Sequence, residues 1–196
     1  YNGDPAAFTN AVSGTGAGAV TYQWQSSINN SSWSDITGAT NATYDPPTGL
    51  TTSTYYRRIT ISTLNGYNCN SVPSNVVLVT VQTAVVDGSI ATNQTICTGG
   101  DPAAFTSVAG GSGSGVISYQ WQSSTSSSST GFLNIAGATS ATYDAPSGLT
   151  TTTYYKRLTV STQNAYACNS TGTNVITVTV LADPTITSQP VGITEC

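Results

Sequence analysis

The sequence predicts an all-β protein built from two tandem sandwich repeats. Three observations predict this class. The chain repeats itself at a period of about 97 to 99 residues, apolar residues alternate with Ser, Thr and Gln over short runs, and no apolar period of about 3.6 residues persists over a helical length. A chain of 196 residues is long enough for two small domains. Each repeat is therefore expected to fold around its own core.

The repeat is visible in short motifs. DPAAFT at 4–9 returns at 101–106, and YQWQSS at 22–27 returns at 119–124, in both cases 97 positions later. Further along the chain the offset becomes 99, so the second copy carries a two-residue insertion in its Ser/Thr-rich stretch 123–131. Insertions are best tolerated in surface loops, and this stretch is expected to be one.

The motifs divide the chain into three parts. We expect a first repeat at 1–82, a second repeat at 83–181, and a segment at 182–196 that serves as a linker or as the first strand of a following repeat. The first repeat's counterpart of Cys97 would stand just before Tyr1. We therefore expect a two-repeat slice of a longer tandem array, with the N-terminal strand of the first repeat truncated.

Each repeat is expected to hold about seven short strands. In the second copy the alternating runs lie at 89–97, 104–109, 116–123, 132–135, 141–143, 154–162 and 174–180. About seven strands in about 99 residues, with turn residues between them, is typical of an immunoglobulin-like β-sandwich. The glycine-rich segments 14–18 and 110–115 lack the Lys and the helix context of a phosphate loop, so we expect turns there.

Four aromatic residues are candidates for the core. Trp24 and Trp121 lie on the expected third strand, where an immunoglobulin-like sandwich buries a Trp between its sheets. Tyr55 and Tyr154 stand at the entrance to the sixth strand and resemble a tyrosine corner. We expect all four to pack inside the repeats.

Trp33 is the candidate for ligand contact. It lies in the expected loop 29–35, and exposed Trp and Tyr side chains are what carbohydrate-binding proteins use as sugar platforms. Its nearest counterpart in the second repeat is Phe132. A loop anchor is the alternative interpretation of Trp33.

The charge content excludes several classes of function. The chain has 4 Lys and Arg, 8 Asp and Glu and no His, and only 6% of its residues are charged. Nucleic-acid binding and polybasic membrane association both need clustered cations. Without His, the Ser-His-Asp and Cys-His triads are ruled out, and so is the commonest metal ligand. We expect neither an enzyme nor a cofactor.

The cations form two equivalent doublets, one in each repeat. The second residue of each doublet is Arg58 or Arg157, and an acid recurs at Asp45 and Asp144. Equivalent spacing of opposite charges predicts a structural ion pair in each repeat, Arg58 with Asp45 and Arg157 with Asp144.

The four cysteines form two equivalent pairs in a chain rich in Ser and Thr, which is typical of an oxidised extracellular protein. The favoured pairing is Cys97 with Cys168, which leaves Cys69 and Cys196 to bond cysteines outside the chain. The alternatives are Cys69–Cys97 with Cys168–Cys196, and bonds across repeat junctions or between chains.

Several motifs together resemble a known family. They are C-x-G-G at 97–100, Y-x-W at 119–121, GATSATY at 137–143, and Cys168 followed by NVITVTV at 174–180. The chain resembles the tandem immunoglobulin-like or PKD-like repeats of giant surface adhesins in Bacteroidota. That resemblance implies type IX secretion, an extracellular location at the cell surface, and a role as a stalk or fibre.

We therefore expect a structural repeat of an adhesin or filamentous surface appendage. Its expected partners are other copies of itself in a homo-oligomeric fibre, and surface glycans of another cell or substratum. No nucleic-acid partner and no membrane insertion are expected. The alternative is a carbohydrate-binding or spacer module of a secreted hydrolase.

Overall fold

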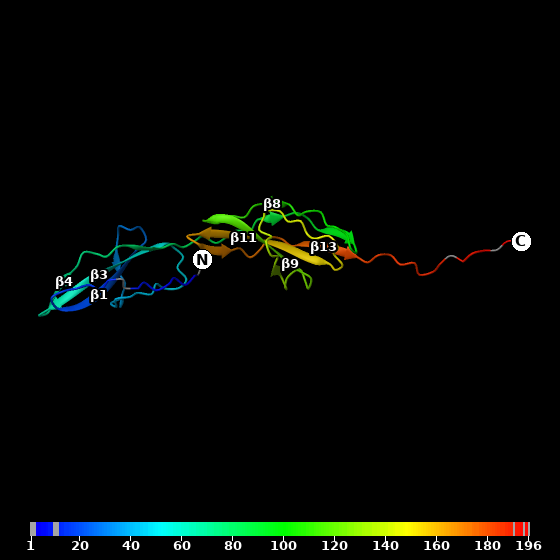
Figure 1. The fold of residues 1–196 in the computed structure, drawn as a ribbon. Helices are drawn as coiled ribbons and strands as arrows, with labels where there is room; N and C mark the ends of the chain where they lie inside the picture. The colour runs from blue at the N-terminus through cyan, green and yellow to red at the C-terminus, as the bar shows by residue number, and fades with distance from the viewer. Residues whose placement is uncertain (1–2, 10–11, 190, 194, 196) are drawn as a thin grey trace. The chain divides into compact units, whose positions relative to one another are not determined.

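The computed structural model describes residues 3–9, 12–189, 191–193 and 195, and the chain forms two compact units (Figure 1). Unit 1 is Tyr1–Thr83 and unit 2 is Ala84–Cys196, so the division falls one residue after the expected one. All regular elements in the described residues are β-strands, which confirms the all-β class.

Unit 1 contains one five-stranded sheet. Its strands are β1 (Ala19–Ser27), β2 (Ser34–Asp35), β3 (Thr54–Leu64), β4 (Tyr67–Asn70) and β5 (Val77–Val79). The sheet order is β2-β1-β3-β4, and β5 pairs with the beginning of β3. β1 and β3 are antiparallel over all nine residues of β1. Facing this sheet, Phe8 and Tyr44 form an isolated bridge with a hydrogen bond of 2.7 Å.

Unit 2 repeats this plan with additional strands. They are β6 (Ser89–Ile90), β7 (Gln94–Cys97), β8 (Ser107–Ala109), β9 (Val116–Ser124), β10 (Leu133–Asn134), β11 (Thr153–Gln163), β12 (Tyr166–Asn169) and β13 (Ile176–Leu181). The main sheet has the order β10-β9-β11-β13-β7 with β12 beside β11, and β6 and β8 form a second, two-stranded sheet. The expected strand 141–143 is reduced to a bridge between Tyr143 and Phe105.

A bridging segment, residues 86–97, joins the two layers of unit 2. Val86 pairs with Ser112, β6 pairs antiparallel with β8, and β7 then crosses to the main sheet and pairs parallel with β13. The sequence predicted one continuous strand at 89–97; the structure divides it because its two ends belong to different sheets.

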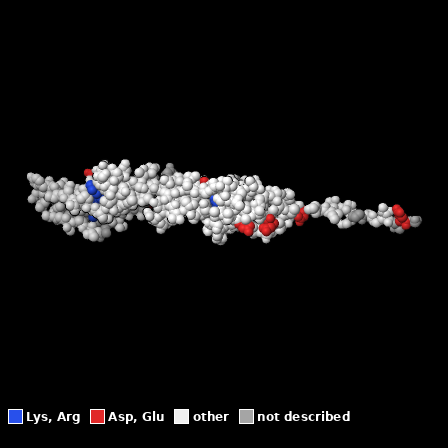
Figure 2. Space-filling model, turned by 90° about the horizontal axis from the view of Figure 1, so that it is seen from above, with Lys and Arg blue, Asp and Glu red and all other residues white. Residues whose placement is uncertain are grey.

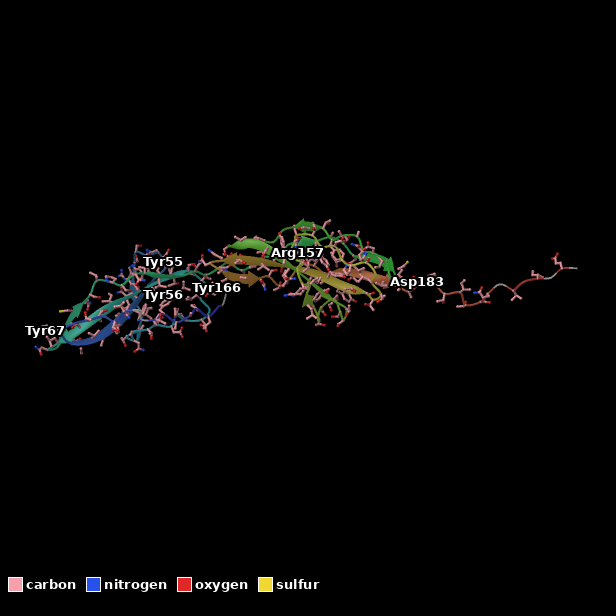
Figure 3. All side chains as sticks on the ribbon, in the orientation of Figure 1. Tyr55, Tyr56, Tyr67, Arg157, Tyr166 and Asp183 are labelled. Atoms are coloured by element: carbon pink, nitrogen blue, oxygen red, sulfur yellow. The ribbon has the colours of Figure 1, made fainter. Side chains whose placement is uncertain are left out.

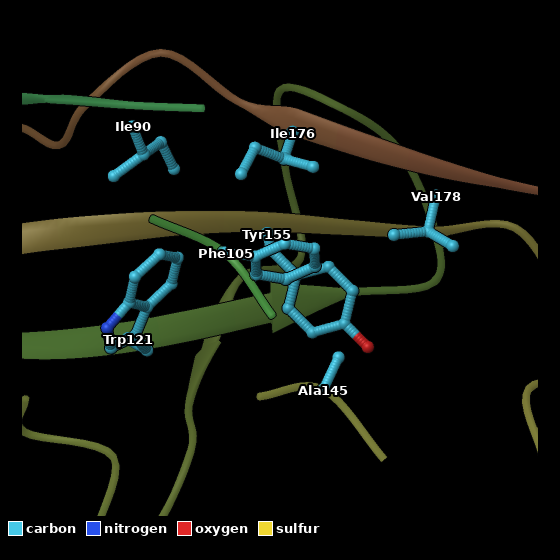
Figure 4. Close-up of a cluster of buried hydrophobic side chains, with 7 residues drawn as sticks. All are labelled: Ile90, Phe105, Trp121, Ala145, Tyr155, Ile176 and Val178. Atoms are coloured by element: carbon cyan, nitrogen blue, oxygen red, sulfur yellow. The ribbon is translucent and has the colours of Figure 1, made fainter. Parts of the chain in front are cut away.

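The core of unit 2 is a cluster of seven buried side chains (Figure 4): Ile90, Phe105, Trp121, Ala145, Tyr155, Ile176 and Val178. Trp121 is fully buried, and its indole Nε1 donates to the carbonyl of Ser140 at 2.9 Å. Trp24 is 6% exposed in unit 1 and makes the equivalent bond to Asn41. The predicted burial of both tryptophans is confirmed.

The prediction for Tyr55 and Tyr154 is wrong by one residue. The buried tyrosines are the next ones, Tyr56 and Tyr155, each 2% exposed, whereas Tyr55 and Tyr154 are only half-buried. Figure 3 labels the pair of unit 1, Tyr55 and Tyr56. Side chains alternate between the faces of a strand, so adjacent tyrosines point in opposite directions. The register that buries Tyr155 also turns Arg157 inward, which the sequence pattern argued against.

The hairpins β3–β4 and β11–β12 were not predicted. Their two-residue turns are Asn65–Gly66 and Asn164–Ala165, and all four residues have positive φ. That geometry is the type I′ turn that favours Asn-Gly. The dipeptide in unit 1 is therefore a sequence signal for the hairpin, and the second repeat weakens this signal by replacing the glycine with alanine.

Replacing Ala165 with glycine should stabilise unit 2. Ala165 has a φ of 66°, in the left-handed region that costs a residue with a Cβ about 1–2 kcal/mol. Because glycine is also less ordered in the unfolded chain, the expected net gain is about 1 kcal/mol, measured by urea unfolding. Gly66→Ala is the matched control and should destabilise unit 1 by a similar amount. Equal stability of Ala165→Gly and wild type would contradict this account.

The prediction of turns in the glycine-rich segments is wrong for 14–16 and 110–113, and the chain bends only at 17–18 and 114–115. Gly111 and Gly113 have no positive φ, and a Cβ added to them would strike the side chains of Thr159 and Ser161 on β11. Gly14 and Gly16 meet Thr60 and Ser62 of β3 in the same way. Glycine is needed at these positions because the segment lies directly against the strand, as in other close backbone approaches.

Candidate functional site

Each unit holds an arginine against its aromatic core. In unit 2 the Arg157 side chain is fully buried, and its guanidinium carbon lies 4.2 Å from the centre of the Tyr119 ring (Figure 3). Its Nη1 donates to the carbonyl of Ala141 at 2.6 Å and its Nη2 to that of Ala109 at 3.0 Å. Its Nε is buried with no hydrogen-bond partner in the described structure. The cation therefore ties the end of β8 and the loop that holds Ala141 to the main sheet.

Unit 1 repeats this arrangement. Arg58 lies 4.4 Å from the Tyr22 ring and donates to the carbonyls of Ala42 and Val12 at 2.7 and 3.0 Å. Unlike its counterpart, Arg58 is only half-buried.

The predicted ion pairs are not formed in the described part of the chain. Arg58 and Arg157 contact backbone carbonyls, and Asp45 and Asp144 are exposed. The physical reason is strand alternation: Asp144 follows Tyr143, which packs against the core cluster, so its carboxylate faces outward. What recurs in both repeats is a cation bound by carbonyl oxygens and aromatic faces.

Burial changes the pKa values of three side chains in the interior of unit 2: Arg157, Tyr155 and Tyr143. Loss of hydration lowers the pKa of Arg157, although the electrostatic interaction with Tyr119 opposes that change. Burial raises the pKa of Tyr155 to about 12, with a smaller contribution from Tyr143. The pKa of Tyr143 is also raised, first by burial and then by the neighbouring charge of Asp144.

Unit 2 should lose stability at alkaline pH in a defined range. In the unfolded chain Tyr155 ionises near its ordinary pKa of 10.0, whereas in the folded unit it keeps its proton up to about 12. Between these values only the unfolded state releases the proton, so the free energy of unfolding falls by about 1.4 kcal/mol per pH unit from this group. Below pH 10 its contribution is constant.

Urea unfolding at a series of pH values measures this slope. The Tyr155→Phe variant cannot ionise at this position, and its slope between pH 10 and 12 should be shallower than that of wild type. Identical slopes for the two proteins would show that Tyr155 does not control the alkaline transition.

Trp33 belongs to a chain of side-chain contacts on the outer surface of unit 1, which we call the polar ladder and which runs from Trp33 through Arg57 and Gln25 to Asp35. The Arg57 guanidinium carbon is 4.1 Å from the centre of the Trp33 ring, and Arg57 Nε donates to Gln25 Oε1 at 2.7 Å. Gln25 Nε2 in turn donates to Asp35 Oδ1 at 2.8 Å. One face of the half-buried Trp33 ring is therefore covered by its own unit.

Unit 2 has a weaker version of this ladder. Lys156 Nζ is 4.6 Å from the centre of the Phe132 ring, and Gln122 donates to Asn134, which stands in place of Asp35. Sequence reasoning found the aromatic residue in both repeats but not the cation that covers it.

The predicted Cys97–Cys168 disulfide is wrong. Among the described residues, Cys69, Cys97 and Cys168 form no disulfide with one another, which also removes the Cys69–Cys97 alternative. Cys168 pairs with Ser161 near the end of β11, whereas Cys97 pairs with Leu181 beyond the start of that strand. At about 3.3 Å per residue they are more than about 25 Å apart along the sheet, far beyond the Cα distance of about 4.4–6.8 Å in a disulfide.

Bonds from Cys69 and Cys196 to cysteines outside the chain stay predictions, and Cys196 lies outside the described residues. Where the structure describes the chain, no three His, Cys, Asp or Glu side chains come together as metal ligands. The same residues include no helix of the length and apolarity needed to cross a membrane.

Comparison with known proteins gives one result that covers both units. No curated protein and no solved structure matches the chain. A family model described as "Domain of unknown function (DUF8696)" matches twice in succession, at residues 1–83 and 86–182. The second match begins at the bridging segment, so the family unit includes it. The two matches cover most of the chain, and the protein belongs to the DUF8696 family.

Proposed function

We propose that this chain is a non-enzymatic structural repeat of an extracellular adhesin or filamentous cell-surface appendage. Each unit would be one immunoglobulin-like module of a stalk. The proposal rests on one observation. The polar residues that occur in both repeats form hydrogen bonds with the backbone of their own unit.

Two duplicated pairs illustrate this use. Arg58 and Arg157 each donate to two backbone carbonyls. Gln23 and Gln120 each donate through Nε2 to a carbonyl of the neighbouring loop, Ile36 or Ile135, at 2.9 Å. Residues that recur because they hold each repeat together are expected in a scaffold whose units are used many times.

The surface supports the same proposal. Figure 2 shows a surface that is almost entirely uncharged, with only small separate patches of either sign. Low charge reduces repulsion between neighbouring copies. It therefore favours lateral association of identical stalks into a bundle, with secretion and the cell surface as the proposed setting.

Electron microscopy of intact source cells, labelled with an antibody against the two-unit chain, tests the proposal. We expect label along extended surface fibres, and averaging along the fibres would give the number of chains side by side. Antibody absorbed beforehand with the purified chain is the control and should leave the fibres unlabelled.

Label confined to compact secreted particles would contradict the appendage. It would favour the alternative, a spacer or carbohydrate-binding module of a secreted hydrolase. In that case binding to a glycan array should be lost in Trp33→Ala and retained in Phe132→Ala.

A further inference from the structure

Two of the four cations in the chain point away from the aromatic interior. Arg58 and Arg157 donate to backbone carbonyls beside the core. Arg57 and Lys156 precede them on β3 and β11, and adjacent residues of a strand point to opposite faces of the sheet. Each repeat therefore places one cation on the outer face of its sheet, at the same position.

Each outward cation lies against an aromatic ring and keeps donors free. Arg57 bonds Gln25 through Nε alone, with its guanidinium carbon 4.1 Å from the centre of the Trp33 ring. Among the described residues, neither Nη1 nor Nη2 of Arg57 has a hydrogen-bond partner, and Lys156 Nζ, 4.6 Å from the centre of the Phe132 ring, has none either. Both cations are half-buried, so their free N–H groups are available to a ligand.

The polar ladder supplies amide groups beside the cation. Gln25 lies directly opposite both Arg57 and Asp35 on the neighbouring strands. In unit 2, Gln122 lies opposite Lys156 in the same register. Each unit thus gathers a ring, a cation and a side-chain amide on one face. Aromatic rings can cover the apolar faces of sugars, while cations and amides bond their polar groups.

The small number of cations restricts the class of ligand. Duplex DNA carries one charge per about 1.7 Å, and proteins neutralise it with many Lys and Arg side chains. Contact with anionic membranes takes clusters of about 4–8 cations. A polysaccharide with carboxylates on its sugars needs only one cation for each bound sugar, and it also presents a ring that Trp33 or Phe132 can cover. The paired N–H groups of arginine match the two oxygens of a carboxylate.

We propose that each unit binds a carboxylate-bearing polysaccharide through its outward cation and the ring beside it. In unit 1, Arg57 donates to the carboxylate through Nη1 and Nη2, and the sugar lies against the part of Trp33 that Arg57 leaves uncovered. In unit 2, Lys156 and Phe132 bind in the same way. The inference rests on the proposed function, because it names the glycan partner of a surface stalk.

The two sites of a chain act together on one polymer. Once a polysaccharide is held at one unit, its contact with the next is intramolecular, which raises the overall affinity above that of either site. The net charge of −4 opposes the binding of an anion. At physiological ionic strength, however, charges more than about 8 Å away are largely screened. Asp35 is two strands from Arg57, about 10 Å, so it weakens the site in unit 1 only in part.

Electrophoresis in native gels that contain polygalacturonate tests the inference, with mobility in a polymer-free gel as the reference. Wild type should be retarded, and the double variant Arg57→Gln with Lys156→Gln should not be. Each single variant should bind at least about tenfold more weakly, because one of two linked contacts is lost. Arg57→Lys, which copies unit 2, should still bind. Asp35→Asn, which gives unit 1 the amide of Asn134, should bind more tightly.

Trp33 emission provides a second measurement, which reports unit 1. Polygalacturonate should change the emission of wild type and of Lys156→Gln, but not that of Arg57→Gln. Trp24 and Trp121 are buried, so they should contribute no change. The far-UV circular dichroism of every variant should match that of wild type, because the substituted side chains lie outside the core.

Methyl-esterified polygalacturonate has the same sugar rings without the charge and should cause little retardation. Equal retardation by the ester would indicate a neutral sugar platform and would overturn the inference. Equal binding of single-stranded DNA or of phosphatidylserine vesicles would do the same, because it would indicate a general attraction to polyanions. A wild-type chain that polygalacturonate does not retard would also overturn it. That result would leave label along cell-surface fibres as it is, so the two proposals fail separately.

Discussion

Trp121→Ala should destabilise unit 2 by about 4 kcal/mol. The indole is fully buried, its ring centre lies 5.5 Å from that of Tyr143 and 5.8 Å from that of Phe105, and its N–H is bonded. Alanine leaves a cavity among aromatic rings and a carbonyl without its donor. A domain of this size has a total stability of about 5–15 kcal/mol, so much of it is lost.

The two units can be followed separately in this experiment. Trp24 and Trp33 are the tryptophans of unit 1, and Trp121 is that of unit 2. In Trp121→Ala the remaining fluorescence reports unit 1 alone and should unfold at the wild-type urea concentration. The circular dichroism transition of unit 2 should move to lower urea. A decrease of less than about 2 kcal/mol in the free energy of unfolding would mean that neighbouring side chains repack into the cavity left by the ring.

Arg157→Ala should cost unit 2 about 3 kcal/mol. A buried cation over an aromatic face contributes about 2 kcal/mol, and two charge-assisted hydrogen bonds to carbonyls are lost with it. The hydration regained by removing a buried charge offsets part of the loss. Urea unfolding followed by circular dichroism gives the difference.

Two further variants separate volume from charge. Arg157→Met fills the space without donors and should cost about 1 kcal/mol, since apolar replacements of buried charges are often near neutral. Arg58→Ala removes a half-buried cation and should cost less than Arg157→Ala. If Arg157→Met destabilised unit 2 as much as Arg157→Ala, the hydrogen bonds to the carbonyls would account for most of the stabilisation. If Arg157→Ala left the stability unchanged, the cation would contribute nothing to it.

The repeat, the all-β class and the buried tryptophans could be predicted because they depend on local patterns. Alternation along a run and an apolar residue in its middle are visible in the sequence alone. The β3–β4 hairpin was also predictable, from Asn65–Gly66. The crossing of the bridging segment from one sheet to the other was not predictable, because it depends on the packing of the two sheets and not on a local sequence pattern.

The interior cation was missed for a specific reason. On β11 the buried residues alternate through Tyr155, Arg157 and Thr159, so the inward face carries a charge and a hydroxyl. A pattern search assigns such residues to the outside, and Tyr154 is expected in the core only from its position at the entrance to the strand. Only the carbonyls of Ala109 and Ala141 and the Tyr119 ring make Arg157 acceptable inside, and they come from distant parts of the chain.

The glycine-rich segments also bear on how this protein is labelled in the laboratory. Gly111 and Gly113 look like flexible spacers in the sequence, yet a Cβ there would collide with β11. A peptide tag or dye site inserted at 110–115 would therefore force the layers apart. The loop around Ser127, whose turn is held by its own hydroxyls and which differs in length between the repeats, is the place to add residues.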